Sequence, residues 1–265
     1  MQYRPNIPYP TNEEAKLVLL ENLFREWEQH FASNASALTK HLAEDMVADG
    51  FYPYYFAQKV RILFIGREAR DISGCNYIDV LFPAYHEKKR IGNQPLNKSK
   101  FHYRMLCIAY GILKGMPAWK DIPYATEIGD GFGTADGISF AFMNVSKLSK
   151  ETEGWTSDWG VINSAHALST QSRNFNQEEI AILEPHVIIT MHLGDRIGSF
   201  GALTPIQSSN QTRSFWLEIG GHRALLIDTW HLSAPYKNDL RDFYDPICDA
   251  VRRSGMVQQV SSPAA

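Results

Sequence analysis

The sequence predicts an α/β protein: a three-layer sandwich with a mostly parallel central sheet of about four strands and helices on both faces. Short β-branched runs that stop at a glycine or a polar residue are typical of buried parallel strands. Segments with apolar residues at helical spacing alternate with these runs, as in βαβ units. The 265 residues, 44% of them hydrophobic, can bury a full core. Because no internal repeat or linker stands out, residues 1–265 are expected to form a single domain.

The N-terminal part is expected to be an extended arm followed by helices over residues 11–58. Residues 1–10 are rich in proline. Thr11 and Glu14 match a capping box that opens a helix. The apolar face of that helix consists of Leu17, Leu20, Phe24, Trp27 and Phe31. A second helix is predicted over 34–48, with Leu38, Leu42 and Met46 in register.

Four strands and three further helices follow in alternation. The strands are predicted at 60–66, 137–144, 186–191 and 223–228. A helix capped by Ser99 runs to Leu113, and Gly115 closes it. A helix over 176–184 ends at Pro185, and a closing helix has its apolar face at Leu240, Phe243, Ile247 and Val251. Residues 255–265 are expected to be a disordered tail.

Composition limits the function classes. The three cysteines are far apart and form no CxxC pair, so we expect no zinc site, no iron–sulfur cluster and no other cofactor. No apolar run approaches the length of a membrane span, and the first residues have no signal-peptide character. We therefore expect a cytoplasmic protein with no membrane partner.

Charge is distributed unevenly. A net charge of −3 disfavours a generally basic nucleic-acid coat protein. Residues 87–104, however, contain six basic residues and one acid, and such a segment can contact phosphates even on an acidic protein. The basic residues are Lys88, Lys89, Arg90, Lys98, Lys100 and Arg104. A solvated loop is the alternative reading.

Polar residues follow the predicted strands where each strand ends. Glu68 lies in "GREARD", Asn144 ends the second strand, residues 194–195 follow the third, and His231 and Ser233 follow the fourth. Ligands of parallel sheets bind beyond the carboxyl ends of the strands. A carboxylate, an amide and an imidazole are therefore expected at one crevice.

These motifs resemble those of the uracil-DNA glycosylase superfamily over roughly residues 60–250. The shared pieces, in order, are "FIGREARD", "FAFMNVSK", "LEPHVIITMHLG" and "LIDTWHLSAP". The resemblance implies a monomeric enzyme that turns a pyrimidine nucleotide out of DNA and hydrolyses its N-glycosidic bond. A carboxylate stabilises the sugar cation and orients water, while an imidazole donates a hydrogen bond to the departing base.

The resemblance also implies roles for individual residues. Glu68 matches the water-activating acid, with Asp71 as the rival in the same loop. Asn144 matches the base-reading asparagine, and His231 matches the histidine of the His-Pro-Ser loop. Phe82 is implied as the aromatic that stacks on the base, with Tyr77 in reserve. Ser233 would hold a phosphate, and Pro235 with Tyr236 would fill the vacated base stack.

Three positions depart from the family pattern. Leu232 replaces the proline of the His-Pro-Ser loop, and Ala69 replaces the proline that usually follows the acid. Arg70 falls where uracil-specific members carry a tyrosine that blocks bulk at the pyrimidine 5-position. We therefore hypothesise that the pocket accepts a modified pyrimidine, such as a hypermodified cytosine of phage DNA, which would give a role in phage defence.

Three alternatives remain. A hydrolase could use Ser233, His231 and Asp228, but no Gly-x-Ser-x-Gly elbow is present. A metal site could combine His186 and His192 with His222 or His231, without an HExxH or Cys/His cluster in support. The third alternative is a catalytically inactive protein of the same fold that binds a nucleic-acid base.

Overall fold

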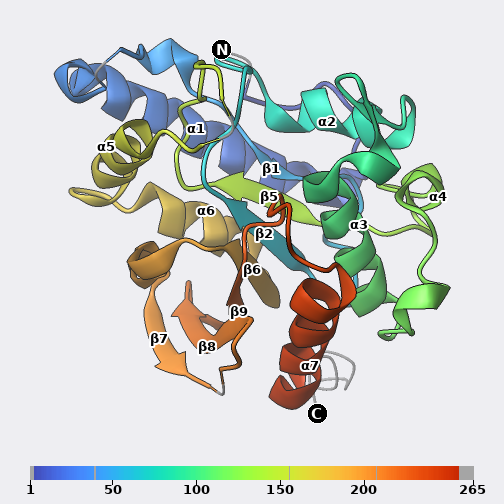
Figure 1. The fold of residues 1–265 in the computed structure, drawn as a ribbon. Coiled ribbons are helices and arrows are strands. Elements are labelled where there is room, and N and C mark those ends of the chain that lie inside the picture. Colours follow the sequence, from blue (N-terminus) through green and yellow to red (C-terminus); the bar gives the residue numbers. More distant parts are fainter. Residues whose placement is uncertain (1–2, 39, 155, 207, 257–265) are drawn as a thin grey trace.

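The computed structural model describes residues 3–256 except 39, 155 and 207. A seven-stranded sheet runs through the molecule in the order β1-β5-β2-β6-β9-β8-β7 (Figure 1). Its strands are β1 (Gly50–Phe51), β2 (Ile62–Gly66), β5 (Ala141–Asn144), β6 (Val187–Met191), β7 (Ala202–Pro205), β8 (Thr212–Ile219) and β9 (His222–Thr229). Two short strands, β3 (Arg90–Ile91) and β4 (Gln94–Pro95), pair with each other apart from the sheet.

The centre of the sheet is parallel, as the sequence predicts. Strands β5, β2, β6 and β9 pair in parallel and correspond to the four predicted strands. The expectation of about four strands was nevertheless too small, because β1, β8 and β7 extend the sheet in antiparallel pairing. Strands β8 and β9 form a hairpin whose two-residue turn, Gly220 and Gly221, has positive φ at both positions. That Gly-Gly turn was the sequence signal for the missed strand.

Helices cover both faces of the sheet (Figure 1). One face carries α1 (Glu14–Ser33), α5 (Trp159–Thr170) and α6 (Phe175–Leu183), and its core includes Leu63 and Ile65 of β2. The other face carries α2 (Tyr77–His86), α3 (Lys100–Leu113), α4 (Ala125–Asp130) and α7 (Asp245–Ser254), and its core includes Ile62 and Phe64. Alternate side chains of each buried strand thus pack into the two hydrophobic cores, one on each face of the sheet.

The predicted helix over 34–48 is wrong. The described residues of this segment form two 3₁₀ turns, at Ala35–Ala37 and Ala43–Asp45, and Leu42 is 58% exposed. The segment then becomes extended, because the Val47 N–H donates to the Lys147 carbonyl oxygen (2.7 Å). Tertiary backbone bonds thus replace the helical ones, and the described part of region 11–58 contains one α-helix.

The predicted capping box at Thr11 does not form either. Residues Thr11–Glu13 make a 3₁₀ turn without a side-chain cap. The buried Glu13 carboxylate instead accepts hydrogen bonds from the N–H groups of Tyr54 (3.0 Å) and Phe56 (2.8 Å). Glu14 pairs with Arg4 of the extended arm. The arm is therefore fixed against α1 through charged side chains.

The remaining helices are confirmed, although Ser99, at the N-cap position of α3, makes no side-chain cap hydrogen bond, and the start of α6 is shifted. α6 is capped by Asn174, whose side chain accepts from the Gln177 N–H (3.0 Å), and not by Asn176. Strand β5 begins at Ala141, four residues later than predicted. Helices α2, α4 and α5 were not predicted, and α2 contains a proline, Pro83.

The end of the chain is only partly described. Met256 is buried, whereas the rest of the predicted tail, 257–265, lies outside the described residues. No helix in the described part of the chain is both long and apolar enough to cross a bilayer.

Candidate active site

Asn144 ends β5 with its side chain on the α2–α3 face of the sheet. The residue is 2% exposed, and its amide Nδ2 is buried without a hydrogen-bond partner among the described residues. Gly66, its register partner at the end of β2, leaves the room for this amide. A Cβ at Gly66 would lie 2.5 Å from Asn144 Oδ1. An unpaired buried amide is costly unless a water or a ligand satisfies it, so Asn144 is a candidate for ligand binding at this edge.

A buried ion cluster supports the Asn144 backbone from behind. Asp49 Oδ2 accepts from the Asn144 N–H (2.8 Å). Lys147 Nζ lies 2.5 Å from Asp49 Oδ1 and 2.7 Å from Glu179 Oε2, and all three side chains are fully buried. Burial, followed by the nearby Asp49 carboxylate, raises the pKa of Glu179 well above its usual value. The Lys147 ammonium contacts both carboxyl groups, and these contacts make the burial of the cluster tolerable.

Glu68 follows β2 and is partly buried. Its Oε1 accepts from the N–H of Asp158, the N-cap of α5 (3.1 Å). Its Oε2 is buried and has no hydrogen-bond partner among the described residues. Burial raises the pKa of this carboxyl, although the Asp158 N–H bond counteracts the shift. A carboxylate with one fixed and one free oxygen is suited to accept a proton from water.

The rival acid and its neighbour lie further out. Asp71 and Arg70 are both exposed. Asp71 has a positive φ of 54°, and its N–H donates to the Lys150 carbonyl oxygen (3.2 Å). The Arg70 guanidinium donates to the Gly154 carbonyl oxygen. Glu68, rather than Asp71, therefore has the sheltered carboxylate.

The hydrogen bonds of His231 determine its tautomer. Its Nδ1 lies 3.3 Å from the Ser233 backbone nitrogen and 2.7 Å from Ser233 Oγ. Because a backbone N–H can only donate, Nδ1 must be the unprotonated acceptor, and Nε2 carries the proton of the neutral ring. Burial, followed by the positive charges of Arg67 and His192, lowers the pKa of His231 to about 4. The ring is thus a neutral Nε2–H donor.

We expect His231 to remain neutral from pH 8 down to pH 5, with its proton on Nε2. Its pKa of about 4 in the folded protein is below the ordinary 6.5, so the unfolded chain binds a proton first as the pH falls. His231 therefore lowers the free energy of unfolding between about pH 6.5 and 4, and adds no pH dependence above that window. Histidine ¹⁵N–¹H NMR spectra measure both tautomer and midpoint. A midpoint near 6.5 would contradict this assignment.

The aromatic residues divide into two groups. Tyr77 stacks on Phe142 with ring centroids 4.4 Å apart, and Phe142 lies two residues before Asn144 on the same face of β5. Phe101 of α3 contacts both Phe142 (6.1 Å) and His231 (5.6 Å). Tyr77 and Phe101 therefore belong to the same side of the sheet edge as the amide and the imidazole.

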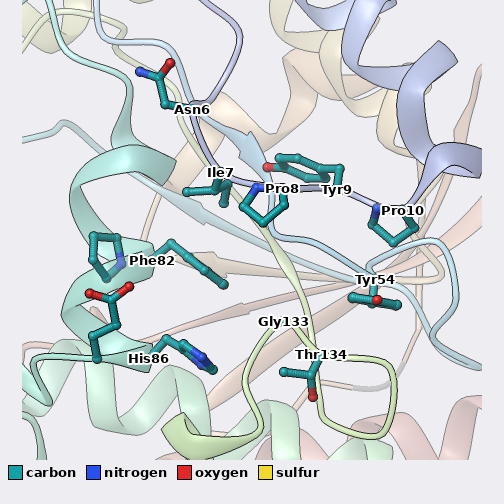
Figure 2. Close-up of a pocket in the computed structure, with 12 residues that line it drawn as sticks. Asn6, Ile7, Pro8, Tyr9, Pro10, Tyr54, Phe82, His86, Gly133 and Thr134 are labelled. Atoms are coloured by element: carbon teal, nitrogen blue, oxygen red, sulfur yellow. The ribbon is translucent and has the colours of Figure 1, made fainter.

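Phe82, the first choice for the stacking aromatic, lies elsewhere. It stacks on His86 (5.4 Å) in the second half of α2. There it lines a cavity of about 610 Å³ between the N-terminal arm, α2 and residues 133–134 (Figure 2). The structure does not bring Phe82 to the strand ends, because the missed helix α2 carries it away from them.

The segment after His231 is held by Arg104, an arginine of the basic segment 87–104 that was expected to contact phosphates. Arg104 of α3 is 1% exposed, and its guanidinium contacts the ring of Phe243 (4.4 Å). It donates to the carbonyl oxygens of Leu232 (2.5 Å), Ala234 (3.0 Å) and Lys237 (3.0 Å), and to Asp239 Oδ1 (2.7 Å). Arg104 thus holds the loop over residues 232–239 through hydrogen bonds on its buried side.

The outer side of the same loop is exposed. Ser233 and Pro235 are exposed, and Tyr236 is 98% exposed. Lys100, at the start of α3, donates to the Pro235 carbonyl oxygen (2.6 Å). The Tyr236 ring is therefore accessible to a binding partner.

The rest of the basic segment is dispersed. Lys89 forms an ion pair with Asp130 (2.9 Å), and Arg90 donates to the Asn93 carbonyl oxygen (2.8 Å). Lys88 and Lys98 are exposed. Apart from the buried Arg104, Lys100 alone among these basic residues is joined to the His231 loop by a hydrogen bond within the described chain.

Two of the alternatives lose support. Asp228 cannot orient His231, because its carboxylate faces the other side of β9 and binds Thr190 Oγ1 (2.7 Å), the Leu193 N–H (3.2 Å) and Arg213 (2.6 Å). No group of three or more His, Cys, Asp or Glu side chains that could hold a metal forms among the described residues.

The chain matches no protein-family model, and no curated protein matches it in sequence. The site must therefore be interpreted from its own geometry.

Proposed function

We propose that the protein is a DNA glycosylase that turns a pyrimidine nucleotide out of the helix and hydrolyses its N-glycosidic bond, leaving an abasic site. It would act as a cytoplasmic monomer without a metal or cofactor. The observation that carries the proposal is the fixed Nε2–H donor of His231 at the same sheet edge as the unpaired amide of Asn144. An amide that reads a base and a neutral donor for its developing negative charge are what this reaction requires.

Each group has a distinct part in the reaction. The bond between the sugar and the base breaks as positive charge develops on the sugar and negative charge on the base. His231 Nε2–H donates to the base oxygen, where that negative charge accumulates. Glu68 accepts a proton from the attacking water through its free Oε2 and stabilises the sugar cation. Asn144 presents a donor and an acceptor to the edge of the pyrimidine.

The surrounding residues would bind the nucleotide and its strand. Tyr77 replaces Phe82 as the proposed base-stacking residue, since it packs on Phe142 beside Asn144. Ser233 and Lys100 would contact phosphates, and Pro235 with the exposed Tyr236 would fill the gap left by the extruded base. Lys88, Lys89, Arg90 and Lys98 would add weaker electrostatic attraction.

The substrate is proposed to be a pyrimidine with a 5-substituent, such as the hypermodified cytosine of phage DNA. Arg70, which falls where the family carries a blocking tyrosine, directs its guanidinium to the Gly154 carbonyl oxygen at the surface. The small, buried Ala69 precedes it. Neither residue provides a bulky ring against the 5-position, and this supports a role in defence against phage.

The proposal is tested with oligonucleotides that contain uracil, thymine, 5-hydroxymethylcytosine or its glucosylated form, in single-stranded and duplex DNA. We expect alkali-labile strand breaks at the substituted cytosines. Release of uracil alone would refute the wide pocket but not the glycosylase. Binding of a modified strand without any release would instead establish the catalytically inactive base-binding protein.

A further inference from the structure

Two arginines share one exposed tryptophan next to the candidate active site. Trp159 is the first residue of α5 and is 40% exposed. The guanidinium carbon of Arg67, just after β2, lies 4.9 Å from the centroid of this ring. That of Arg196, in the 3₁₀ helix Gly194–Phe200 after β6, lies 4.8 Å from it. We call these three residues the Trp159 platform.

Among the residues that the structure describes, the guanidinium groups of the platform bond only to neutral atoms. Arg67 donates to Ser157 Oγ (3.4 Å) and the His192 carbonyl oxygen (3.3 Å), and its Nε is buried without a partner in the described chain. Arg196 donates to the Leu193 carbonyl oxygen (3.3 Å) and to Asn163 Oδ1. Neither forms an ion pair with a carboxylate in the described part of the chain, whereas Arg104, Arg173 and Arg213 each do.

Two like charges that contact one ring repel each other, and such repulsion costs free energy. Burial lowers the pKa of Arg67; the attraction of the Glu68 and Asp228 carboxylates opposes this shift, and the repulsion of Arg196 adds to it. An anion that contacts both guanidinium groups would offset their repulsion. Arginine forks match the oxygens of a phosphate, and stacking on an indole holds each guanidinium in place.

The platform continues directly from the proposed catalytic groups. The N–H of Asp158, the residue before Trp159, donates to Glu68 Oε1. α5 lies on one face of the sheet, whereas α3 and the loop that ends in Tyr236 lie on the other (Figure 1). A DNA strand that contacts Tyr236 and then crosses the carboxyl ends of the β-strands would therefore pass over Trp159.

We propose that the Trp159 platform binds the phosphate backbone of the substrate DNA strand, on the opposite side of the extruded nucleotide from Tyr236. This inference rests on the proposed function, because it takes the strand that crosses the sheet edge to be the substrate. Arg67 and Arg196 bind phosphate oxygens, and the exposed part of Trp159 contacts a sugar or an unstacked base.

The test measures binding instead of base release. Fluorescein-labelled single-stranded and duplex DNA is titrated with the Glu68→Gln protein at several salt concentrations, with and without Arg196→Met. The measured quantity is the slope of the logarithm of the DNA-binding constant against the logarithm of the salt concentration. We expect Arg196→Met to make this slope less steep by about 1 for the form of DNA, single-stranded or duplex, that the platform binds. Arg196→Lys should keep the slope, since it retains the charge. Arg253→Met, which removes an exposed cation of α7, should leave it unchanged.

The outcomes separate the two proposals. Arg196→Met could make the salt dependence of DNA binding less steep while the protein releases no base from any substrate. That result would support phosphate binding by the platform and refute the glycosylase activity. If base is released but the slope of Arg196→Met equals that of Arg253→Met, the platform is refuted and the glycosylase remains. A thermal melt verifies that each variant is folded, and Trp159→Leu gives a second, charge-neutral variant that should weaken single-strand binding severalfold. Equal binding by both platform variants and the parent protein would overturn the inference.

Discussion

Replacing Glu68 by glutamine is expected to slow base release by about 10²–10⁴-fold while DNA binding is retained. The free Oε2 is the atom proposed to accept the proton of water, and an amide cannot accept it. Glutamine keeps an oxygen that can accept from the Asp158 N–H, so the start of α5 should stay in place. Single-turnover assays with enzyme in excess separate the chemical step from binding.

Asp71→Asn is the matched control for this prediction. Asp71 lies in the same loop but is exposed, and its described hydrogen bond comes from its backbone and not from its carboxylate. The variant should release base at nearly the rate of the parent protein. Full activity of Glu68→Gln together with loss in Asp71→Asn would reverse the assignment of the acid.

Replacing Arg104 by methionine is expected to lower the free energy of unfolding by about 3 kcal/mol. Methionine preserves contact with Phe243 but removes the four hydrogen bonds that the guanidinium donates to the loop. Three carbonyl oxygens and the Asp239 carboxylate then lose their partner, and the carbonyls lie where water has limited access. Urea denaturation monitored by tryptophan fluorescence measures the change.

The loop should respond more strongly than the rest of the protein. Without Arg104, the chain from Leu232 to Asp239 loses the bonds that give it one conformation, so His231 and Tyr236 lose their placement. Limited proteolysis should cut this loop first. Arg104→Lys should give an intermediate loss, because an ammonium cannot reproduce the fork of donors, and the exposed Lys114→Met should be neutral. A loss below about 1 kcal/mol for Arg104→Met would show that the loop is held by other contacts.

Local patterns located most of the parallel core. The β-branched runs predicted β2, β6 and β9, and the amphipathic faces predicted α1 and α3. Each of these elements has one hydrophobic pattern that persists over consecutive residues. Their strand ends also predicted that Glu68, Asn144 and His231 would lie along one edge. In a parallel sheet this edge follows from chain direction alone.

Patterns failed where a residue's partner is distant in the chain. The spacing of Leu38, Leu42 and Met46 is helical, but backbone bonds to residues near 147 impose an extended segment. Phe82 appeared close to the acid in sequence, yet the ten residues of α2 carry it toward the N-terminal arm. Separation in sequence therefore did not predict the position of Phe82, because a helix lies between it and the acid.

The sequence by itself therefore determined a mostly parallel α/β sheet and the residue types that meet at its carboxyl edge. Only the tertiary structure decided which atoms are free to act: the unpaired Nδ2 of Asn144, the free Oε2 of Glu68 and the Nε2–H tautomer of His231. It also decided that Arg104 is a buried support, while Arg67 and Arg196 meet at Trp159. The reason is that the sequence specifies residue type and charge directly. Burial and hydrogen-bond partners are defined only after residues far apart in sequence have packed together.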